Sequence, residues 1–191
     1  HHINAYEKED TNEIICDICA YDPKYFDLNK LTREDVFTEK LLSSKTIRSI
    51  AKRIRIPLSI NLLDNKSKKV FCPIHDINSD IVFELPVINY AKNNGLPYKF
   101  IYGVNNIYKT PFSVVKINAD TGECLEIEFK EEGKNFLPTE PVYIAKSPDS
   151  IEEDDGVLLV LVLSDKNDFL SVINAKDMKE ISRAQVPDDV K

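Results

Sequence analysis

The sequence has few glycines and few cysteines, and both shortages exclude classes of function. It contains five glycines and four cysteines in 191 residues. The chain lacks a glycine-rich loop that could cradle phosphate, and it lacks the Gly-x-Ser-x-Gly turn that presents a nucleophilic serine. Four cysteines in a chain of this length do not make the disulfide network of a small secreted domain. A reducing, cytoplasmic location is therefore expected.

Positive charge and long apolar runs are also scarce. The formal net charge is −7 and the pI is about 5.1, so the basic surface typical of nucleic-acid-binding proteins is missing. Basic residues in 45–55 alternate with isoleucines, which indicates the solvated face of a strand or helix end. The apolar run 157–163 is much shorter than the roughly 18 residues of a membrane-spanning helix. No nucleic-acid partner is expected.

Short segments rich in Val, Ile, Phe and Tyr dominate the chain and predict an all-β fold. Turn signals such as Asn-Gly, Thr-Gly, Asp-Gly and proline separate them. One stretch, 28–43, has apolar residues at helical spacing and a possible cap at its start, so a short helical insertion is predicted there. The predicted strands cover residues 13–20, 48–56, 70–73, 81–85, 99–102, 113–118, 124–129, 142–145, 157–163, 169–174 and 180–186.

Two segments of the chain, 113–123 and 171–180, resemble each other. Each consists of an apolar strand, an Ile-Asn-Ala turn, a few polar residues and the start of a second strand. Asn118 and Asn174 occupy equivalent places 56 positions apart, which is close to the length of a four-stranded propeller blade. Together with the all-β pattern, this similarity favours part of a β-propeller over a β-sandwich.

The chain opens with two histidines, and neutral imidazole is a preferred ligand for iron, copper and zinc. On an extended strand His1 and His2 point to opposite faces, so at most one of them can face a given metal ion. A ligating histidine usually passes its second ring N–H to a carboxylate, which fixes its orientation. The alternative for both histidines is a structural role or an origin in a purification tag.

Two glutamates next to prolines are candidates for that carboxylate. Glu84 lies in an apolar segment directly before Leu85-Pro86, and Glu140 has prolines on both sides. A glutamate in apolar surroundings is costly to bury without a partner. The alternative for Glu84 is a solvent-facing position on an alternating strand. His1, Glu84 and Glu140 thus indicate one metal ligand and two orienting carboxylates of a site that is incomplete in this chain.

The remaining candidates are interpreted as structural. Cys16 and Cys19 form a Cys-x-x-Cys pair, but residues three apart on a strand face opposite ways and no second pair completes a zinc site. All four cysteines are therefore assigned to packing, and His75 to a surface loop. The acidic run 152–155 lacks the ligand spacing of an EF-hand and indicates a solvated turn.

Five blocks of sequence occur in a distinctive order, at residues 1–7, 83–90, 97–103, 138–143 and 152–157. They resemble the carboxy-terminal part of animal carotenoid cleavage oxygenases, a family that also contains retinoid isomerases. The similarity covers nearly the whole chain and is weakest over 23–79. Five ordered blocks are much more specific than any one of them alone. Beyond these blocks, the match continues at residues 174–178 and 183–184.

This resemblance implies a seven-bladed β-propeller with a helical cap and a non-haem ferrous iron, Fe(II), held by four histidines, three of them oriented by glutamates. His1 matches the third of these ligands, and His2 matches its non-ligating neighbour. Glu84 matches the glutamate that orients His1, and Glu140 the one that orients the fourth histidine. The other three ligands are expected outside residues 1–191. The chain is therefore expected to be one incomplete propeller domain, inactive by itself.

The resemblance also implies the reaction. Iron held by neutral imidazoles keeps an open position for dioxygen, and the family uses it to cleave a carotenoid double bond to apocarotenoid or retinal aldehydes. A carotenoid or retinoid and O2 are thus the expected partners, reached through peripheral association with a membrane. Two alternatives stay open. One is a retinoid isomerase (isomerohydrolase) of the same family, and the other is a non-enzymatic β-propeller interaction module.

Overall fold

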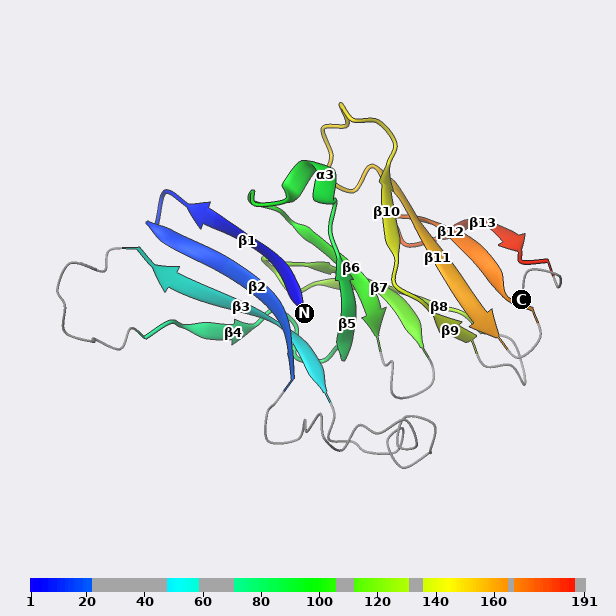
Figure 1. The fold of residues 1–191 in the computed structure, drawn as a ribbon, viewed down its shortest axis with the longest axis horizontal. Coiled ribbons are helices and arrows are strands. Elements are labelled where there is room, and N and C mark those ends of the chain that lie inside the picture. The colour runs from blue at the N-terminus through cyan, green and yellow to red at the C-terminus, as the bar shows by residue number, and fades with distance from the viewer. Residues whose placement is uncertain (22–47, 59–70, 106–111, 131–135, 165–166, 188–191) are drawn as a thin grey trace.

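The computed structural model describes residues 1–21, 48–58, 71–105, 112–130, 136–164 and 167–187 (Figure 1). These residues form three antiparallel sheets, which lie side by side in chain order, and one short helix, α3 (Tyr90–Asn93). The predicted all-β class is confirmed. Within the described ranges the sheets do not close into a ring. The predicted helix at 28–43 lies outside the described residues.

Sheet A contains the first four strands in sequential order. Its two long central strands pair from Glu13–Pro57 to Tyr21–Ser49. The sequence did not predict its first strand, and the strand predicted at 70–73 was wrong because the last strand begins only at Ile74. The strands of sheet A are β1 (His2–Lys8), β2 (Glu13–Tyr21), β3 (Ser49–Pro57) and β4 (Ile74–Asp76).

Sheet B repeats this order with the next four strands and has α3 between its first two. All six residues of its third strand are buried, because both faces of the sheet are covered. The strands are β5 (Phe83–Val87), β6 (Phe100–Asn105), β7 (Ser113–Asn118) and β8 (Cys124–Glu128). The bounds of β7 agree with the prediction at both ends.

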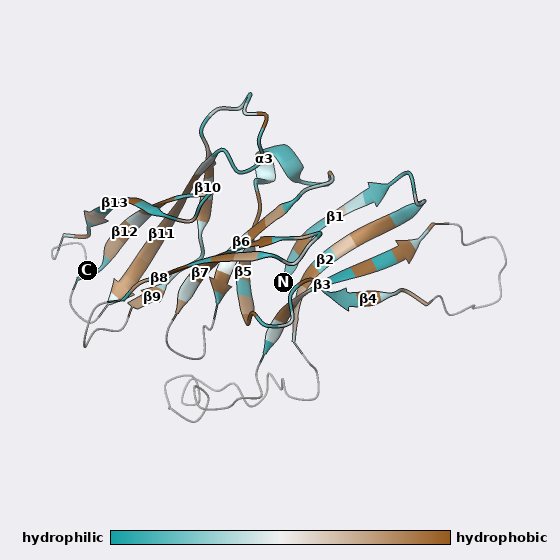
Figure 2. Ribbon diagram, turned by 180° about the vertical axis from the view of Figure 1, so that it is seen from behind, coloured by the Kyte–Doolittle hydropathy of each residue, from teal (hydrophilic) through white to brown (hydrophobic). Residues whose placement is uncertain are grey.

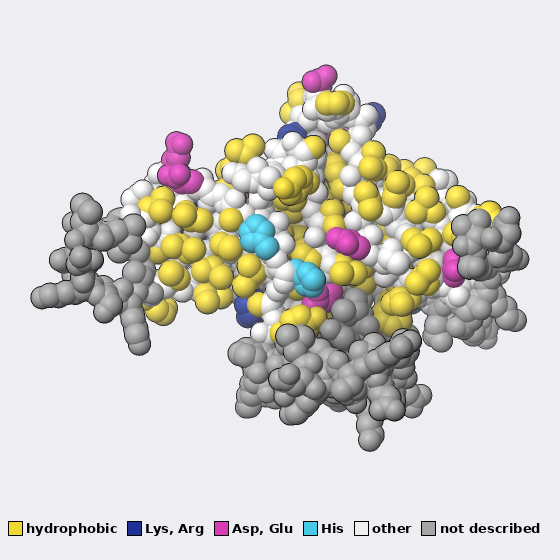
Figure 3. Space-filling model, in the orientation of Figure 1, with side chains coloured by type: hydrophobic (Ala, Val, Ile, Leu, Met, Phe, Trp, Pro, Cys, Tyr) yellow, Lys and Arg dark blue, Asp and Glu magenta, His cyan; other side chains and the backbone are white. Residues whose placement is uncertain are grey.

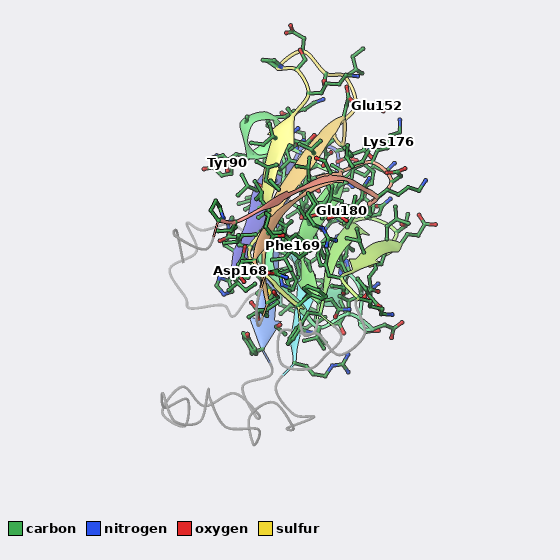
Figure 4. The ribbon with its side chains drawn as sticks, turned by 90° about the vertical axis from the view of Figure 1, so that its right-hand side faces the viewer. Tyr90, Glu152, Asp168, Phe169, Lys176 and Glu180 are labelled. Atoms are coloured by element: carbon green, nitrogen blue, oxygen red, sulfur yellow. The ribbon has the colours of Figure 1, made fainter. Side chains whose placement is uncertain are left out.

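Sheet C contains a third meander of four strands, to which a short strand is added. The additional strand β9 (Phe136–Pro138), which was not predicted, pairs with the far end of β11 beyond its pairing with β10. Figure 4 shows this sheet from its side, with Glu152 and Lys176 near one end and Asp168 and Phe169 near the other. The four main strands are β10 (Val142–Ala145), β11 (Gly156–Ser164), β12 (Phe169–Asn174) and β13 (Glu180–Gln185).

The similar segments found in the sequence form the third strand of sheets B and C and the turn that leads to the fourth strand. In each turn the asparagine side chain accepts a backbone N–H two residues ahead, at 3.0 Å for Asn118 and 2.8 Å for Asn174. Four residues after each asparagine the backbone is left-handed, with φ 75° at Gly122 and 57° at Met178. The internal similarity is therefore structural, even though only one of the two left-handed residues is the favoured glycine.

Sheet B separates two hydrophobic clusters. Alternate residues on a strand face opposite ways, so Ile101 and Val115 join residues of sheet A, whereas Tyr102 and Val114 join residues of sheet C. Figure 2 shows the apolar strand centres and the more polar outer strands. All residues of β4 and β13 are exposed. The core therefore lies between the sheets.

Candidate metal-ligand site

His1 is fixed at the start of β1 by paired backbone bonds to β2. Its terminal ammonium group donates to the Cys19 carbonyl oxygen at 2.9 Å, and its own carbonyl oxygen accepts the Cys19 N–H at 2.7 Å. The imidazole itself is 57% exposed. The backbone of this residue is thus anchored while its ring remains accessible to a ligand.

Glu84 lies at an irregularity in β5. The pairing register with β6 shifts between Glu84 and Val87, and Leu85 has a φ of 52°. A non-glycine residue in this region is uncommon, and such strain and bulges often occur next to functional sites, where they re-aim a side chain. The Glu84 side chain is only 1% exposed. The alternative interpretation of Glu84 as a solvent-facing residue is therefore wrong.

The structure brings His1 and Glu84 together from different sheets. The distance between His1 Nε2 and Glu84 Oε2 is 3.4 Å, although 83 positions separate the residues. The other carboxylate oxygen, Oε1, is buried and has no hydrogen-bond partner among the described residues. Buried carboxylate oxygens are normally satisfied. The arrangement leaves the second ring nitrogen of His1 available to a metal ion.

Two buried donors of sheet A lie behind this carboxylate. Ser49 Oγ donates to the Phe83 carbonyl oxygen at 2.7 Å, and Cys19 Sγ donates to the same oxygen at 2.6 Å. Burial, followed by the negative charge of Glu84, raises the pKa of Cys19 to about 12, so the thiol is protonated at neutral pH. The assignment of Cys19 to packing is confirmed by its burial but missed this contact. Nothing in the sequence pattern indicated Ser49.

Glu140 forms no hydrogen bond or ion pair with His1 or Glu84. It is exposed, between β9 and β10, and has neither a hydrogen bond nor an ion pair with another described residue. His2 is exposed on β1, and His75 is exposed on β4 rather than in a loop. Figure 3 shows histidine and acidic side chains among hydrophobic ones on one face of the molecule. Glu140 therefore has no histidine to orient within the described part of the chain.

The described residues fit one ligand of a metal site and not a whole site. They contain no group of three or more His, Cys, Asp or Glu side chains that could hold a metal ion. An imidazole with a buried carboxylate on one nitrogen is, however, the usual form of a histidine ligand. His1 and Glu84 therefore fit a single metal ligand and the carboxylate that would orient it.

Three antiparallel meanders, with an imidazole and a buried carboxylate in contact between two of them, define an all-β protein. The family model of retinal pigment epithelial membrane protein (RPE65) matches residues 1–191, and the chain belongs to this family. In the described ranges, no helix is long and apolar enough to cross a membrane.

Curated relatives agree with this family. The chain is 32% identical over 211 residues to beta,beta-carotene 15,15'-dioxygenase of Gallus gallus. The aligned residues cover 97% of this chain and 38% of that relative. It is 28% identical over 217 residues to a mitochondrial carotenoid-cleaving dioxygenase of Mustela putorius furo. Here the aligned residues cover 98% of this chain and 39% of that relative. The chain thus spans about two-fifths of the length of these relatives.

Proposed function

We propose that this chain is part of a non-haem Fe(II) dioxygenase that cleaves a carotenoid double bond to apocarotenoid or retinal aldehydes. The observation that carries the proposal is the 3.4 Å contact between the His1 imidazole and the buried Glu84 carboxylate in a chain of this family. The carotenoid-cleaving activity named for the relatives supports the reaction. The proposed full domain is a seven-bladed propeller, to which sheets A, B and C contribute three blades.

In this proposal His1 is an iron ligand and Glu84 orients it. The carboxylate fixes the ring and increases the basicity of the nitrogen that faces the metal. Bound Fe(II) would supply the activation of O2. Glu140 is exposed and unpaired in the described part of the chain, so it is available to orient another histidine contributed from outside residues 1–191.

Two alternatives differ in how well they agree with these findings. Membership of the family counts against an interaction module without enzymatic function, because the curated relatives quoted are named as dioxygenases. A retinoid isomerase of the same family shares the proposed ligand set, so the contact between His1 and Glu84 does not separate the two reactions. Carotenoid cleavage is favoured by the names of the relatives. A cytoplasmic location with peripheral membrane association stays part of the proposal.

Product analysis of the full-length protein tests the reaction. With β-carotene under oxygen we expect retinal, identified by chromatography against standards. The His1→Ala variant should abolish the product, and Glu84→Gln should lower its rate of formation. His75→Ala is the matched control, because His75 is exposed on β4 far along the chain from the proposed ligand. Absence of any aldehyde, together with isomerisation of a retinyl ester, would favour the isomerase instead.

Residues 1–191 alone should bind ferrous iron weakly, because they supply one proposed ligand where a non-haem site needs several. Titration calorimetry of the isolated chain should show no tight one-to-one complex. A tight complex that survives substitution of His2 and His75 but disappears in His1→Ala would contradict the proposed division of ligands.

A further inference from the structure

The backbone next to Glu84 is held by two side chains from the neighbouring sheet. The Phe83 carbonyl oxygen, on the peptide bond that joins Phe83 to Glu84, accepts both Ser49 Oγ and Cys19 Sγ. A carbonyl oxygen has two lone pairs, so this one is fully engaged. Ser49 is 0% and Cys19 3% exposed, which means that water does not compete for these bonds.

The same peptide is confined by β6 of its own sheet. A Cβ atom added to Gly103 would lie 2.5 Å from the Phe83 ring and 2.6 Å from the Glu84 carbonyl oxygen. The left-handed Leu85 follows directly. The main chain at Glu84 is thus held from both sheets, whereas the carboxylate oxygen Oε1 has no donor among the described residues. The backbone from which this carboxylate extends is therefore fixed from two sides.

Cys19 also contacts the other member of the pair. Its N–H and its carbonyl oxygen form the two backbone bonds that fix His1. One residue of β2 therefore links the backbone of the proposed ligand to the backbone of the carboxylate that orients it. Ser49, on the adjacent strand β3, strengthens only the second of these links.

We propose that Ser49 and Cys19 are positioning residues, which hold the Phe83 carbonyl oxygen and thereby keep the Glu84 carboxylate against the His1 imidazole. This inference rests on the proposed function, because it takes His1 as an iron ligand. Neither residue contacts the metal in this proposal, and each acts only through Glu84. Loss of either hydrogen bond should therefore weaken iron retention without adding to the loss of Glu84 itself.

The test measures the rate at which iron leaves the loaded full-length protein for an excess of a ferrous chelator, with total iron determined by mass spectrometry. The set comprises wild type, Ser49→Ala, Glu84→Gln and the double variant. Outer partners of a metal ligand typically change metal affinity about 10- to 100-fold. We expect release to be about 10- to 100-fold faster in Glu84→Gln and about 3- to 10-fold faster in Ser49→Ala. The double variant should release iron no faster than Glu84→Gln, because residues that act through one group are not additive.

Ser113→Ala is the matched control. Ser113 is a fully buried serine at the start of β7, and its hydroxyl has no hydrogen-bond partner among the described residues. Its removal should leave iron release unchanged. Cys19→Ala repeats the test at the second donor if Ser49→Ala fails to fold, and Cys19→Ser, which keeps a donor, should restore slow release.

The outcomes separate the two proposals. Equal fold increases in release for Ser49→Ala in the presence and absence of Glu84→Gln would overturn the positioning role, because the serine would then act independently of the carboxylate. Wild-type release in Glu84→Gln would instead overturn the role of Glu84 in the proposed function. If Ser113→Ala accelerated iron release as much as Ser49→Ala, the effect of Ser49→Ala would be explained by general loosening of the core. That result would also overturn the inference.

Discussion

A buried basic side chain contacts the neighbouring sheet both between sheets A and B and between sheets B and C, but with different geometry. Within sheet A, the Arg53 guanidinium donates two bonds of 2.9 Å to Asp17 on the neighbouring strand. Two further bonds connect this pair to residues next to the strands of sheet B: Arg53 donates to Asp120 at 2.9 Å, and Asp17 accepts a bond from Tyr98. Burial alone would lower the pKa of Arg53, but these bonds to Asp17 and Asp120 raise it. A planar fork, which tolerates little displacement, thus holds in place the two side chains through which sheet A contacts sheet B.

Between B and C, a single ammonium group replaces the fork. Lys116 Nζ donates to Asp154 Oδ2 at 2.6 Å and to the Lys176 carbonyl oxygen at 2.9 Å. The rings of Tyr102 and Tyr143 stack beside it, with centroids 5.6 Å apart. An ammonium group is a point charge without a preferred plane, so this interface depends more on apolar packing. The comparison indicates that the stricter geometry lies in sheet A, on the side where it contacts sheet B.

The largest effect is expected at the A–B interface. Arg53→Ala leaves the fully buried Asp17 without its guanidinium partner and should lower the free energy of unfolding by about 3–5 kcal/mol. Arg55→Ala on the same strand is the control, because Arg55 is 39% exposed and lies 4.0 Å from Glu13; it should cost less than about 1 kcal/mol. Urea unfolding of the full-length protein measures both. Similar losses in the two variants would remove the distinction.

At the B–C interface, Lys116→Met should cost about 2–4 kcal/mol, because Asp154 loses its partner but keeps some contact with solvent, with 11% of its side chain exposed. The double variant Lys116→Met/Asp154→Leu should recover most of this loss, since apolar groups can replace a buried ion pair. Urea midpoints of the two variants give the comparison. A double variant as unstable as Lys116→Met would show that the ion pair itself is required here.

Gly103→Ala should cost about 1–3 kcal/mol, because the new methyl group overlaps the Phe83 ring and the backbone of Glu84. It should also accelerate iron release, since it displaces the orienting carboxylate. Gly95→Ala is the control: Gly95 has a φ of 73°, and its added Cβ meets no atom within 4 Å. That variant should lose stability through backbone strain alone and retain iron normally. Faster release from both variants would contradict this explanation.

The smallest effect is expected at the exposed edge of sheet C. Burial on its own would raise the pKa of Glu180, but hydrogen bonds from Arg183 and Ser171 outweigh it and lower the pKa. The contribution of Glu180 to stability is therefore present above its usual value of 4.5 and is lost as the pH falls through the lowered value. Glu180→Gln should cost no more than about 0.5 kcal/mol at pH 7. The difference from wild type should vanish in acid, which unfolding curves at several pH values will check.

Strands with strong local signals were predictable from the sequence. The bounds of β7, β10 and β12 agree with the predictions, because β-branched and aromatic residues fill these strands. The three-residue strands β4 and β9 carry too few residues for a pattern, and neighbouring strands determine where they form. Short local runs thus depend on tertiary pairing, which a sequence pattern does not contain.

For the site too, some residues were predictable from the sequence and others were revealed only by the structure. The sequence singled out His1, Glu84 and Glu140, and the structure pairs the first two. It did not indicate Ser49, because a lone serine at the start of a strand has no distinctive pattern. Asp17 and Arg53 were likewise hidden, since they are brought opposite each other only by the pairing of β2 with β3.

The sequence by itself determined the all-β class, most of the strands and the residue types that can bind a metal, because these depend on side-chain chemistry and on spacing along one segment. The tertiary structure alone decided that Glu84 is buried, that it faces His1 across 83 positions of chain, and that Glu140 stays exposed. These properties depend on how separate sheets pack. At Glu84, a bulge in its own strand and two hydrogen bonds from another sheet hold the backbone in place, and neither is a property of the local sequence.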